Sequence, residues 1–222
     1  MSHRPYVTAR TLAAAVERWR RALRPYARRR PFPDLRCAAL LIVDLEHTFV
    51  DPRGQAFLPA ARAVLPNVLR LRDAFRAAGR PVAFTRHAHR AGERAGSMSR
   101  HWRWLIREGT PEARLVPDLR PRRGEPVLRK AQYSAFHGTR LEAWLRRRRI
   151  GTLVVAGVMT HLCVETTARE AFARELDVVV PLDACASSDE TIHLGALRAL
   201  ANGFGVVPTT AEVLRRLATR DP

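Results

Sequence analysis

A length of 222 residues and a hydrophobic content of 46% predict one globular domain with a single core. Because the sequence has no run of about 20 apolar residues and no apolar segment like that of a signal peptide, we expect neither a membrane span nor a signal peptide. The three cysteines lack paired spacings, which argues against a disulfide framework or a cysteine zinc site and favours a reducing, cytoplasmic location. The net charge of +18 comes from dispersed arginines without an aromatic-interleaved basic motif, so it predicts a solvated surface and no specific nucleic-acid partner.

Residues 1–36 are predicted to form an N-terminal helical extension followed by a tether. Four apolar residues recur at helical spacing and form one stripe: Leu12, Val16, Trp19 and Leu23. A proline-punctuated, arginine-rich segment then leads into the main domain, residues 37–222. The apolar stripe needs a partner, which is either this domain or a second subunit.

From residue 37 onward, short apolar runs rich in β-branched residues alternate with longer stretches of helical periodicity. This alternation predicts a doubly wound α/β fold, with a mostly parallel six-stranded sheet and helices on both faces. The expected strands are residues 37–44, 81–86, 126–130, 152–158, 177–184 and 204–209. The expected helices are residues 60–78, 138–148, 161–175, 189–202 and 211–219.

The segment 87–125 is long and irregular, with a short helix expected over 102–107. Long connections in α/β folds often cover an active site. We therefore expect this segment to lie over the functional end of the sheet.

Three residues capable of chemistry follow strands that are well separated in the chain. The first strand ends in Asp44, the third ends in Lys130, and the fourth leads into a helix whose first turn carries Cys163. In an open parallel sheet, ligands bind beyond the carboxyl ends of the strands. The sequence therefore predicts that an acid, an amine and a thiol meet at one edge of the sheet.

Each of the three residues also has an ordinary structural explanation. An aspartate after a strand is often a turn residue, a lysine is usually solvated, and a cysteine near a helix start is often a small core residue. Lys130 is nevertheless the one lysine among the 39 Lys and Arg residues. An ammonium is a compact donor, whereas a guanidinium is planar and has a different reach and shape. The single lysine therefore indicates a site that an arginine side chain would not fit.

The three groups together have a definite chemistry. If Thr160 caps the helix, Cys163 stands at its third position, where backbone N–H groups and the helix dipole favour a thiolate. The Asp44 carboxylate can take the thiol proton and pass it to a departing amine, while Lys130 stabilises the developing anions. Four aromatic residues are candidate walls of the substrate pocket: Phe49, Trp102, Tyr133 and Phe136.

The segments LLIVDLEHTF, RKAQYSAFHGTRLEAWLR, TLVVAGVMTHLCVETTAREAF and VVVPLDACAS resemble those of the isochorismatase-like cysteine hydrolases in order and spacing. The resemblance implies a doubly wound, usually oligomeric hydrolase with Asp44, Lys130 and Cys163 as the catalytic triad. It further implies a cis peptide bond before Met159, and an oxyanion hole formed by the backbone amides of Met159 and Cys163. Family members hydrolyse C–N bonds of small amide, ureido or carbamoyl substrates through a thioester.

The departures from the family pattern narrow the expected chemistry. Nicotinamidases carry an Asp-x-His metal motif soon after the first strand, whereas residues 49–64 contain no histidine. We therefore expect neither a metal nor another cofactor, and His87 and His89 either line the pocket or are solvated. The glutamine that usually follows the catalytic aspartate by two positions is Glu46 here, which leaves any substrate contact at that position open.

Two other functions remain open from the sequence. An isochorismatase-type vinyl-ether hydrolase would use Asp44 and Lys130 without a nucleophile, and such enzymes typically lack the cysteine. A non-catalytic relative would bind a ligand or nucleic acid through its basic surface, although the complete triad favours an enzyme. The leading hypothesis is a cofactor-independent, homo-oligomeric amidohydrolase that acts on a small molecule.

Overall fold

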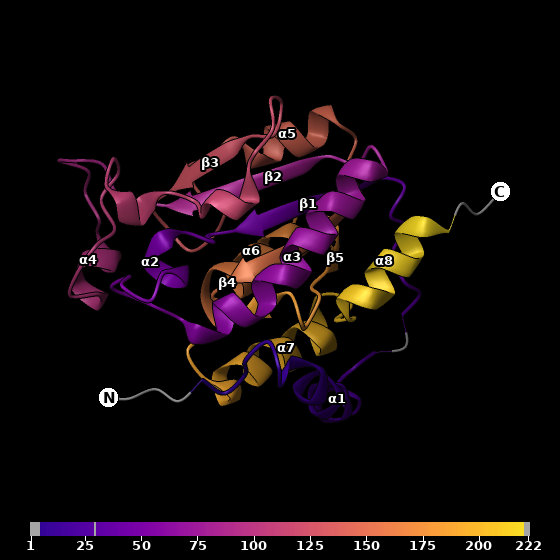
Figure 1. Cartoon of the computed structure of the whole chain (residues 1–222). Helices are drawn as coiled ribbons and strands as arrows, with labels where there is room; N and C mark the ends of the chain where they lie inside the picture. The colour runs from indigo at the N-terminus through magenta and orange to yellow at the C-terminus, as the bar shows by residue number, and fades with distance from the viewer. Residues whose placement is uncertain (1–4, 29, 220–222) are drawn as a thin grey trace.

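In the computed structural model, which describes residues 5–28 and 30–219, one parallel sheet forms the centre of the fold (Figure 1). Its strands follow the order β3-β2-β1-β4-β5, and β6 pairs separately with β4. The strands are β1 (Ala38–Val43), β2 (Val82–His87), β3 (Val127–Lys130), β4 (Thr152–Val158), β5 (Asp177–Val179) and β6 (Cys185–Ala186). All the pairings are parallel, so the predicted doubly wound α/β fold is confirmed.

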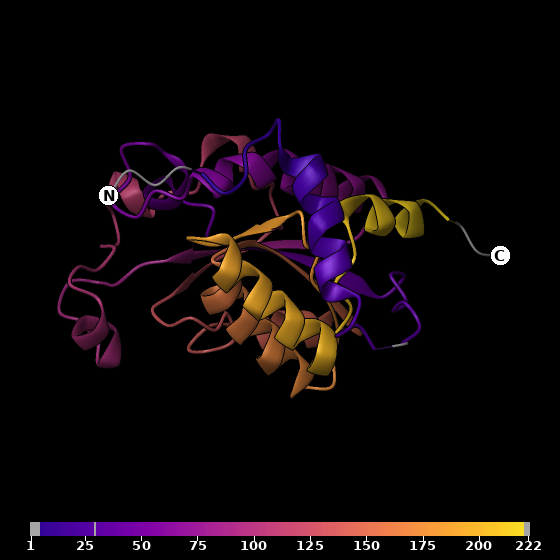
Figure 2. The same cartoon turned by 90° about the horizontal axis from the view of Figure 1, so that it is seen from below.

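Helices cover both faces of the sheet (Figure 2). Helices α3 and α8 pack together on one face, whereas α6 and α7 pack together on the other. The helices are α1 (Leu12–Leu23), α2 (His47–Val50), α3 (Pro59–Ala77), α4 (Ser97–His101), α5 (Leu141–Arg147), α6 (Glu165–Phe172), α7 (Glu190–Gly203) and α8 (Thr210–Ala218). Short 3-10 helices are η1 (Pro111–Ala113) and η2 (Pro117–Leu119), and a π-helix, η3 (Thr160–Val164), precedes α6. Within the described ranges, no helix has both the length and the apolar character needed to cross a membrane.

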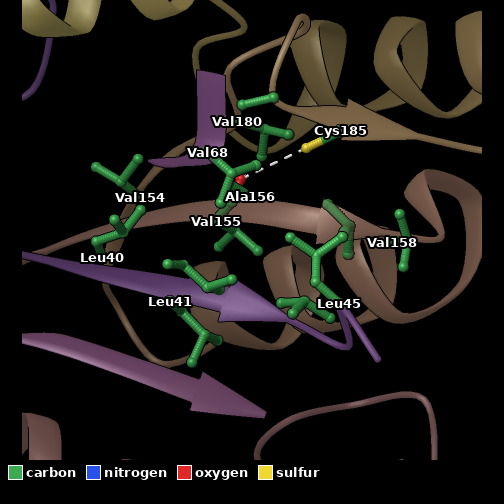
Figure 3. Close-up of a cluster of buried hydrophobic side chains, with 14 of the residues drawn as sticks. Leu40, Leu41, Leu45, Val68, Val154, Val155, Ala156, Val158, Val180 and Cys185 are labelled. Carbon is green, nitrogen blue, oxygen red and sulfur yellow. Dashed lines mark hydrogen bonds between the residues drawn. The ribbon is translucent and has the colours of Figure 1, made fainter. Parts of the chain in front are cut away.

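Strands β1 and β4 are buried along their whole lengths, which explains why their sequences are continuously apolar. Leu40 lies opposite Val154 in the register of these two strands, and their side chains join a buried cluster between the sheet and the helices (Figure 3). Cys185 belongs to the same cluster and donates from Sγ to the Val155 carbonyl at 3.7 Å. The core is therefore centred on the two strands that flank the change in strand order.

The carboxyl ends of β1 and β4 approach each other closely at this point, where the strand order reverses. Gly157 has a φ of +123°, and a Cβ atom built on it would lie 2.1 Å from the carbonyl oxygen of Val43. Asp44, the next residue along β1, has a φ of 50°, in the left-handed region that costs most residues other than glycine free energy. A tight backbone contact and a strained residue therefore mark the sheet edge at which α/β folds bind ligands.

The C-terminal part of the sheet differs from its sequence-based prediction. The strand expected over 204–209 is reduced to an isolated bridge between Val206 and Val179, and the sixth strand is β6. Val180 and Leu182 still donate to the carbonyls of Val206 and Pro208. Pro208 has no N–H group to return a hydrogen bond, so a regular ladder cannot continue there.

The prediction of a helix over 102–107 is also wrong. The short helix in this region is α4, which ends at His101, and Trp102 already has an extended backbone. His89 explains the difference, because its N–H donates to the Ile106 carbonyl and its carbonyl accepts from the N–H of Glu108. These bonds hold the segment against the end of β2 in an extended form.

Helix α1 packs against the chain's own α7, which resolves the alternative left open by its apolar stripe (Figure 2). Trp19 is fully buried, its ring lies 4.7 Å from that of His193, and its Nε1 donates to Glu190 at 2.6 Å. Residues 1–4 and 29 of the predicted extension lie outside the described residues.

Candidate active site

Asp44 is fixed at the end of β1 by the neighbouring strand. Its Oδ1 accepts a hydrogen bond of 2.6 Å from Thr85 Oγ1, and its backbone N–H lies 3.3 Å from the Thr85 carbonyl oxygen. The Asp44 side chain is completely buried. Thr85 was not recognised from the sequence, although a polar residue inside the apolar run VAFT is a usable signal for it.

Lys130, the last residue of β3, lies between the acid and the thiol. Its Nζ is 2.6 Å from Asp44 Oδ2, 3.1 Å from Cys163 Sγ and 3.1 Å from the Gln132 carbonyl oxygen. Lys130 is 1% exposed. The structure therefore brings the three residues singled out in the sequence together in one buried cluster.

Cys163 stands in the π-helix η3, which begins directly after β4. Thr160 does not cap this helix: the N-cap is Met159, and Thr160 Oγ1 is instead hydrogen-bonded to His193 Nδ1 at 2.9 Å. The wide π turn still places Cys163 in the first turn of the continuous segment formed by η3 and α6. Such π turns are frequent at functional sites.

The backbone around Cys163 contains the features expected of an oxyanion hole. The peptide bond between Val158 and Met159 is cis, as the family resemblance implies. The amides of Leu162 and Val164 donate to the Met159 carbonyl, whereas the Cys163 amide between them does not. The Met159 amide, the other expected donor, belongs to the cis peptide bond at the end of β4. Both amides are thus candidates to donate to a substrate oxygen.

Burial controls the charges of the cluster. It raises the pKa of the Cys163 thiol to about 12, against the opposing effect of the Lys130 charge, so the thiol is protonated at neutral pH. Burial is the largest single effect on Lys130 and disfavours its ammonium, but the contacts with Asp44 and Cys163 together outweigh it and raise the pKa of Lys130. Because the resting thiol is protonated, a base must remove its proton during attack, which is the role expected of Asp44.

His87 is a neutral neighbour of the triad with one defined tautomer. Its Nδ1 lies 3.5 Å from Lys130 Nζ, and burial, followed by the Lys130 charge, lowers the pKa of His87 to about 3. An ammonium can only donate, so Nδ1 is the acceptor and we assign the imidazole proton to Nε2. His87 can therefore offer a neutral N–H donor.

Glu46 is completely buried beside the triad. This burial was not expected from the sequence, because glutamate is usually exposed. The backbone N–H of His87 donates to Glu46 Oε1 at 2.6 Å, while Oε2 has no hydrogen-bond partner among the described residues. Burial and then the Asp44 charge raise the pKa of Glu46 well above its usual value, against smaller effects of Lys130 and Arg86. Burial thus favours the protonated form of Glu46, a neutral group similar in shape to glutamine.

Replacing Glu46 with glutamine should therefore make stability less sensitive to pH. Above pH of about 4.5, unfolded Glu46 loses its proton while the folded form keeps it, which lowers the free energy of unfolding by up to about 1.4 kcal/mol per pH unit until the folded pKa is reached. Urea unfolding at about pH 5 and about pH 8 should show that Glu46→Gln gains stability over wild type only at the higher pH. An equal difference at both pH values would mean that Glu46 is ionised in the folded protein.

A cavity of about 80 Å³ opens beside Cys163. Three of the four aromatic residues proposed from the sequence line it, namely Phe49, Trp102 and Tyr133. Phe136 does not, because its ring is buried elsewhere under the guanidinium of Arg174, at 4.5 Å from the ring centroid. The segment between β2 and β3 supplies much of the remaining wall, in agreement with its expected position over the site. The lining residues that sequence reasoning missed are Ala56, Met98, Trp104, Leu105, Ile106 and Leu162.

The two histidines after β2 have different environments. His87 lines the cavity, whereas His89 does not. His89 is fully buried, and its ring nitrogens have no hydrogen-bond partner among the described residues. Ligand atoms of Asp44, His87 and Cys163 all lie within 4.8 Å of one another, close enough to be considered as a metal site. The Lys130 ammonium, however, contacts all three, so a divalent cation would have to displace it.

The chain was compared with known proteins. Residues 38–212 match the isochorismatase domain. The chain is 34% identical over 200 residues to nicotinamidase 3 of Arabidopsis thaliana, and the match covers 87% of this chain and 96% of the relative. It is 28% identical over 186 residues to N-carbamoylsarcosine amidase of an Arthrobacter species, and that match covers 81% of this chain and 70% of the relative. A cysteine hydrolase structure from Pseudomonas syringae pv. phaseolicola 1448A superimposes with a TM-score of 0.81 at 28% identity, over 86% of this chain and 98% of that one. The sequence motifs, the fold and these matches together show that the chain belongs to the isochorismatase family of hydrolases.

Proposed function

We propose that this isochorismatase-family hydrolase is a cysteine-dependent amidase, with Asp44, Lys130 and Cys163 as its catalytic residues. The observation that carries the proposal is the chain of short contacts from Asp44 Oδ2 through Lys130 Nζ to Cys163 Sγ, beside a cavity. The two named amidases among the relatives support hydrolysis of a non-peptide C–N bond.

The first half of the reaction forms a thioester. Cys163 Sγ attacks the amide carbonyl carbon while its proton passes to Asp44, and the carbonyl oxygen becomes an oxyanion. The backbone amides of Met159 and Cys163 donate to this oxyanion, and each such donor contributes about 3 kcal/mol in related sites. Asp44 then returns the proton to the departing nitrogen as the C–N bond breaks, and Lys130 keeps its charge throughout.

The second half releases the acid. Water attacks the thioester carbonyl while Asp44 accepts one of its protons, and the same two amides hold the second oxyanion. The C–S bond breaks, the carboxylic acid leaves, and the proton held by Asp44 returns to Sγ. The protonated resting thiol and the neighbouring carboxylate are thereby restored.

Two alternatives give different experimental results. A vinyl-ether hydrolase would need Asp44 and Lys130 only, and the contact between Lys130 Nζ and Cys163 Sγ, at 3.1 Å, favours the amidase over it. A binding protein would retain its ligand when Asp44 and Cys163 are both replaced. The test is a screen for ammonia release from amides, ureido acids and carbamoyl compounds: release by wild type and its loss in Asp44→Asn supports the amidase, and no release from any compound rejects it.

The amidase activity should be independent of metal. Because the Lys130 ammonium contacts every member of the candidate metal cluster, catalysis by the triad leaves no place for a divalent ion there. Dialysis against EDTA should leave the rate of ammonia release within about twofold of that of the untreated enzyme, since no step needs a Lewis acid. Loss of activity on dialysis with recovery on adding zinc would contradict this mechanism.

A further inference from the structure

The walls of the cavity carry no cation in a chain that is otherwise rich in arginine. Among the described residues, no Arg, Lys, Asp or Glu side chain lines this cavity. Its surface comes mainly from apolar side chains, including Trp104, Leu105 and Leu162. The protein has a formal net charge of +18, so a cavity wall without arginine stands out in this chain. The charge of the lining side chains therefore limits which substrates the cavity can accept.

Three cations on the strands that lead to the cavity are paired, whereas Arg103, between the wall residues Trp102 and Trp104, is exposed. Lys130 is 1% exposed and directs its ammonium at Asp44, 2.6 Å away. Arg86 and Arg129, at the ends of β2 and β3, form ion pairs with Glu108 and Glu93 respectively. None of these three paired cations is free to neutralise a carboxylate on a bound substrate.

The polar groups that do face the cavity are neutral. Trp102 Nε1 donates to Tyr133 Oη at 2.8 Å, which uses an acceptor site of the phenol and leaves its O–H able to donate. His87 offers a second neutral donor through Nε2, because its Nδ1 faces Lys130. A substrate in this cavity thus meets apolar surface and a small number of uncharged donors.

We infer that the substrate is a small uncharged amide with an apolar acyl group, and that compounds carrying a carboxylate on the acyl side are rejected. This inference rests on the proposed amidase function and adds the substrate class to it. Burying a carboxylate without a partner is costly, and a cavity of about 80 Å³ leaves little room for the water that would otherwise solvate it. The acyl group is expected to pack between Trp102 and Leu105, with its carbonyl directed at Cys163.

Butyramide and succinamate form a direct test, because they share a chain length and differ in a terminal methyl or carboxylate group. The kcat/KM for ammonia release should be at least about 100-fold higher for butyramide, which corresponds to about 2.7 kcal/mol. The best amide from the screen and its ω-carboxylate analogue form a second pair with the same expectation. N-carbamoylsarcosine, which carries a carboxylate, should react far more slowly than its methyl ester.

A variant that places a cation on the cavity wall tests the cause of the preference. Leu105→Arg should reduce the ratio of butyramide to succinamate activity by about tenfold or more, because the guanidinium can pair with the carboxylate. Leu105→Gln is the matched control: it adds polarity without charge and should leave the ratio close to that of wild type. An equal shift in both variants would show that polarity, and not charge, sets the preference, and would overturn the inference.

The remaining outcomes separate the inference from the proposed function. If wild type cleaves succinamate as well as or better than butyramide, the substrate class is wrong and the amidase function stands. If no amide in either charge class releases ammonia, the amidase function fails, and the substrate class fails with it.

Discussion

Replacement of Cys163 by alanine is expected to reduce kcat for amide hydrolysis by about 10,000-fold or more, because the nucleophile and the thioester are both lost. The fold should survive, since the change removes one sulfur atom that borders a cavity. The rate of ammonia release is the primary measurement, and circular dichroism with thermal unfolding establishes that the variant is folded.

Cys185→Ala provides the matched control for this experiment. Cys185 is also a buried thiol, and burial raises its pKa to about 12, as it does for Cys163. It lies in the core, with its Sγ 3.7 Å from the Val155 carbonyl oxygen, and does not line the cavity. This variant should lose about 1 kcal/mol of stability and keep its activity within a few-fold of wild type. Loss of activity in both variants with equal loss of stability would point to a structural role for Cys163.

Lys130→Arg should lower kcat/KM by about 100-fold or more although it conserves the charge. Lys130 Nζ has four acceptors within 3.5 Å, including Asp44 Oδ2 and Cys163 Sγ, and its side chain is completely buried. A guanidinium is larger and planar, so it cannot keep these contacts without pushing Asp44 away from the thiol. The measurement is the steady-state rate of the folded variant on the best substrate of the screen.

Two further variants separate charge from shape at this position. Lys130→Met preserves the approximate length of the side chain without its charge, and should lose at least as much activity as Lys130→Arg. Arg146→Lys exchanges the same residue types at an exposed position on α5 and should change neither rate nor stability measurably. Activity of Lys130→Arg within a few-fold of wild type would mean that this lysine is not part of the catalytic machinery.

The three triad residues could be predicted from the sequence more fully than the residues that line the cavity. Asp44 and Lys130 stand at the ends of strands and Cys163 just beyond one, and the doubly wound topology brings these ends to one edge of the sheet regardless of loop conformation. Phe136 lies in an irregular segment after β3, where no periodicity determines which way a side chain points. The same limit applies to Leu105, in the long connection, whose position depends on backbone bonds between His89 and residues distant in sequence.

Protonation states also could not be derived from sequence position. The first helical turn favours a thiolate at Cys163, but burial outweighs the Lys130 charge and keeps the thiol protonated. Glu46 stands where glutamine is usual, and its burial beside Asp44 favours its neutral form. Both effects depend on desolvation in the assembled structure, and only the fold reveals it.

Cys163 is expected to carry the acyl group during turnover, and mass spectrometry of the enzyme quenched during steady-state hydrolysis can detect this adduct. The peptide containing Cys163 should gain the mass of the acyl group, hydroxylamine should remove this mass, and the Cys163→Ala protein should show no such adduct. Rapid turnover with the acyl group on a different residue, or full amidase activity in Cys163→Ala, would show that Cys163 is not the nucleophile.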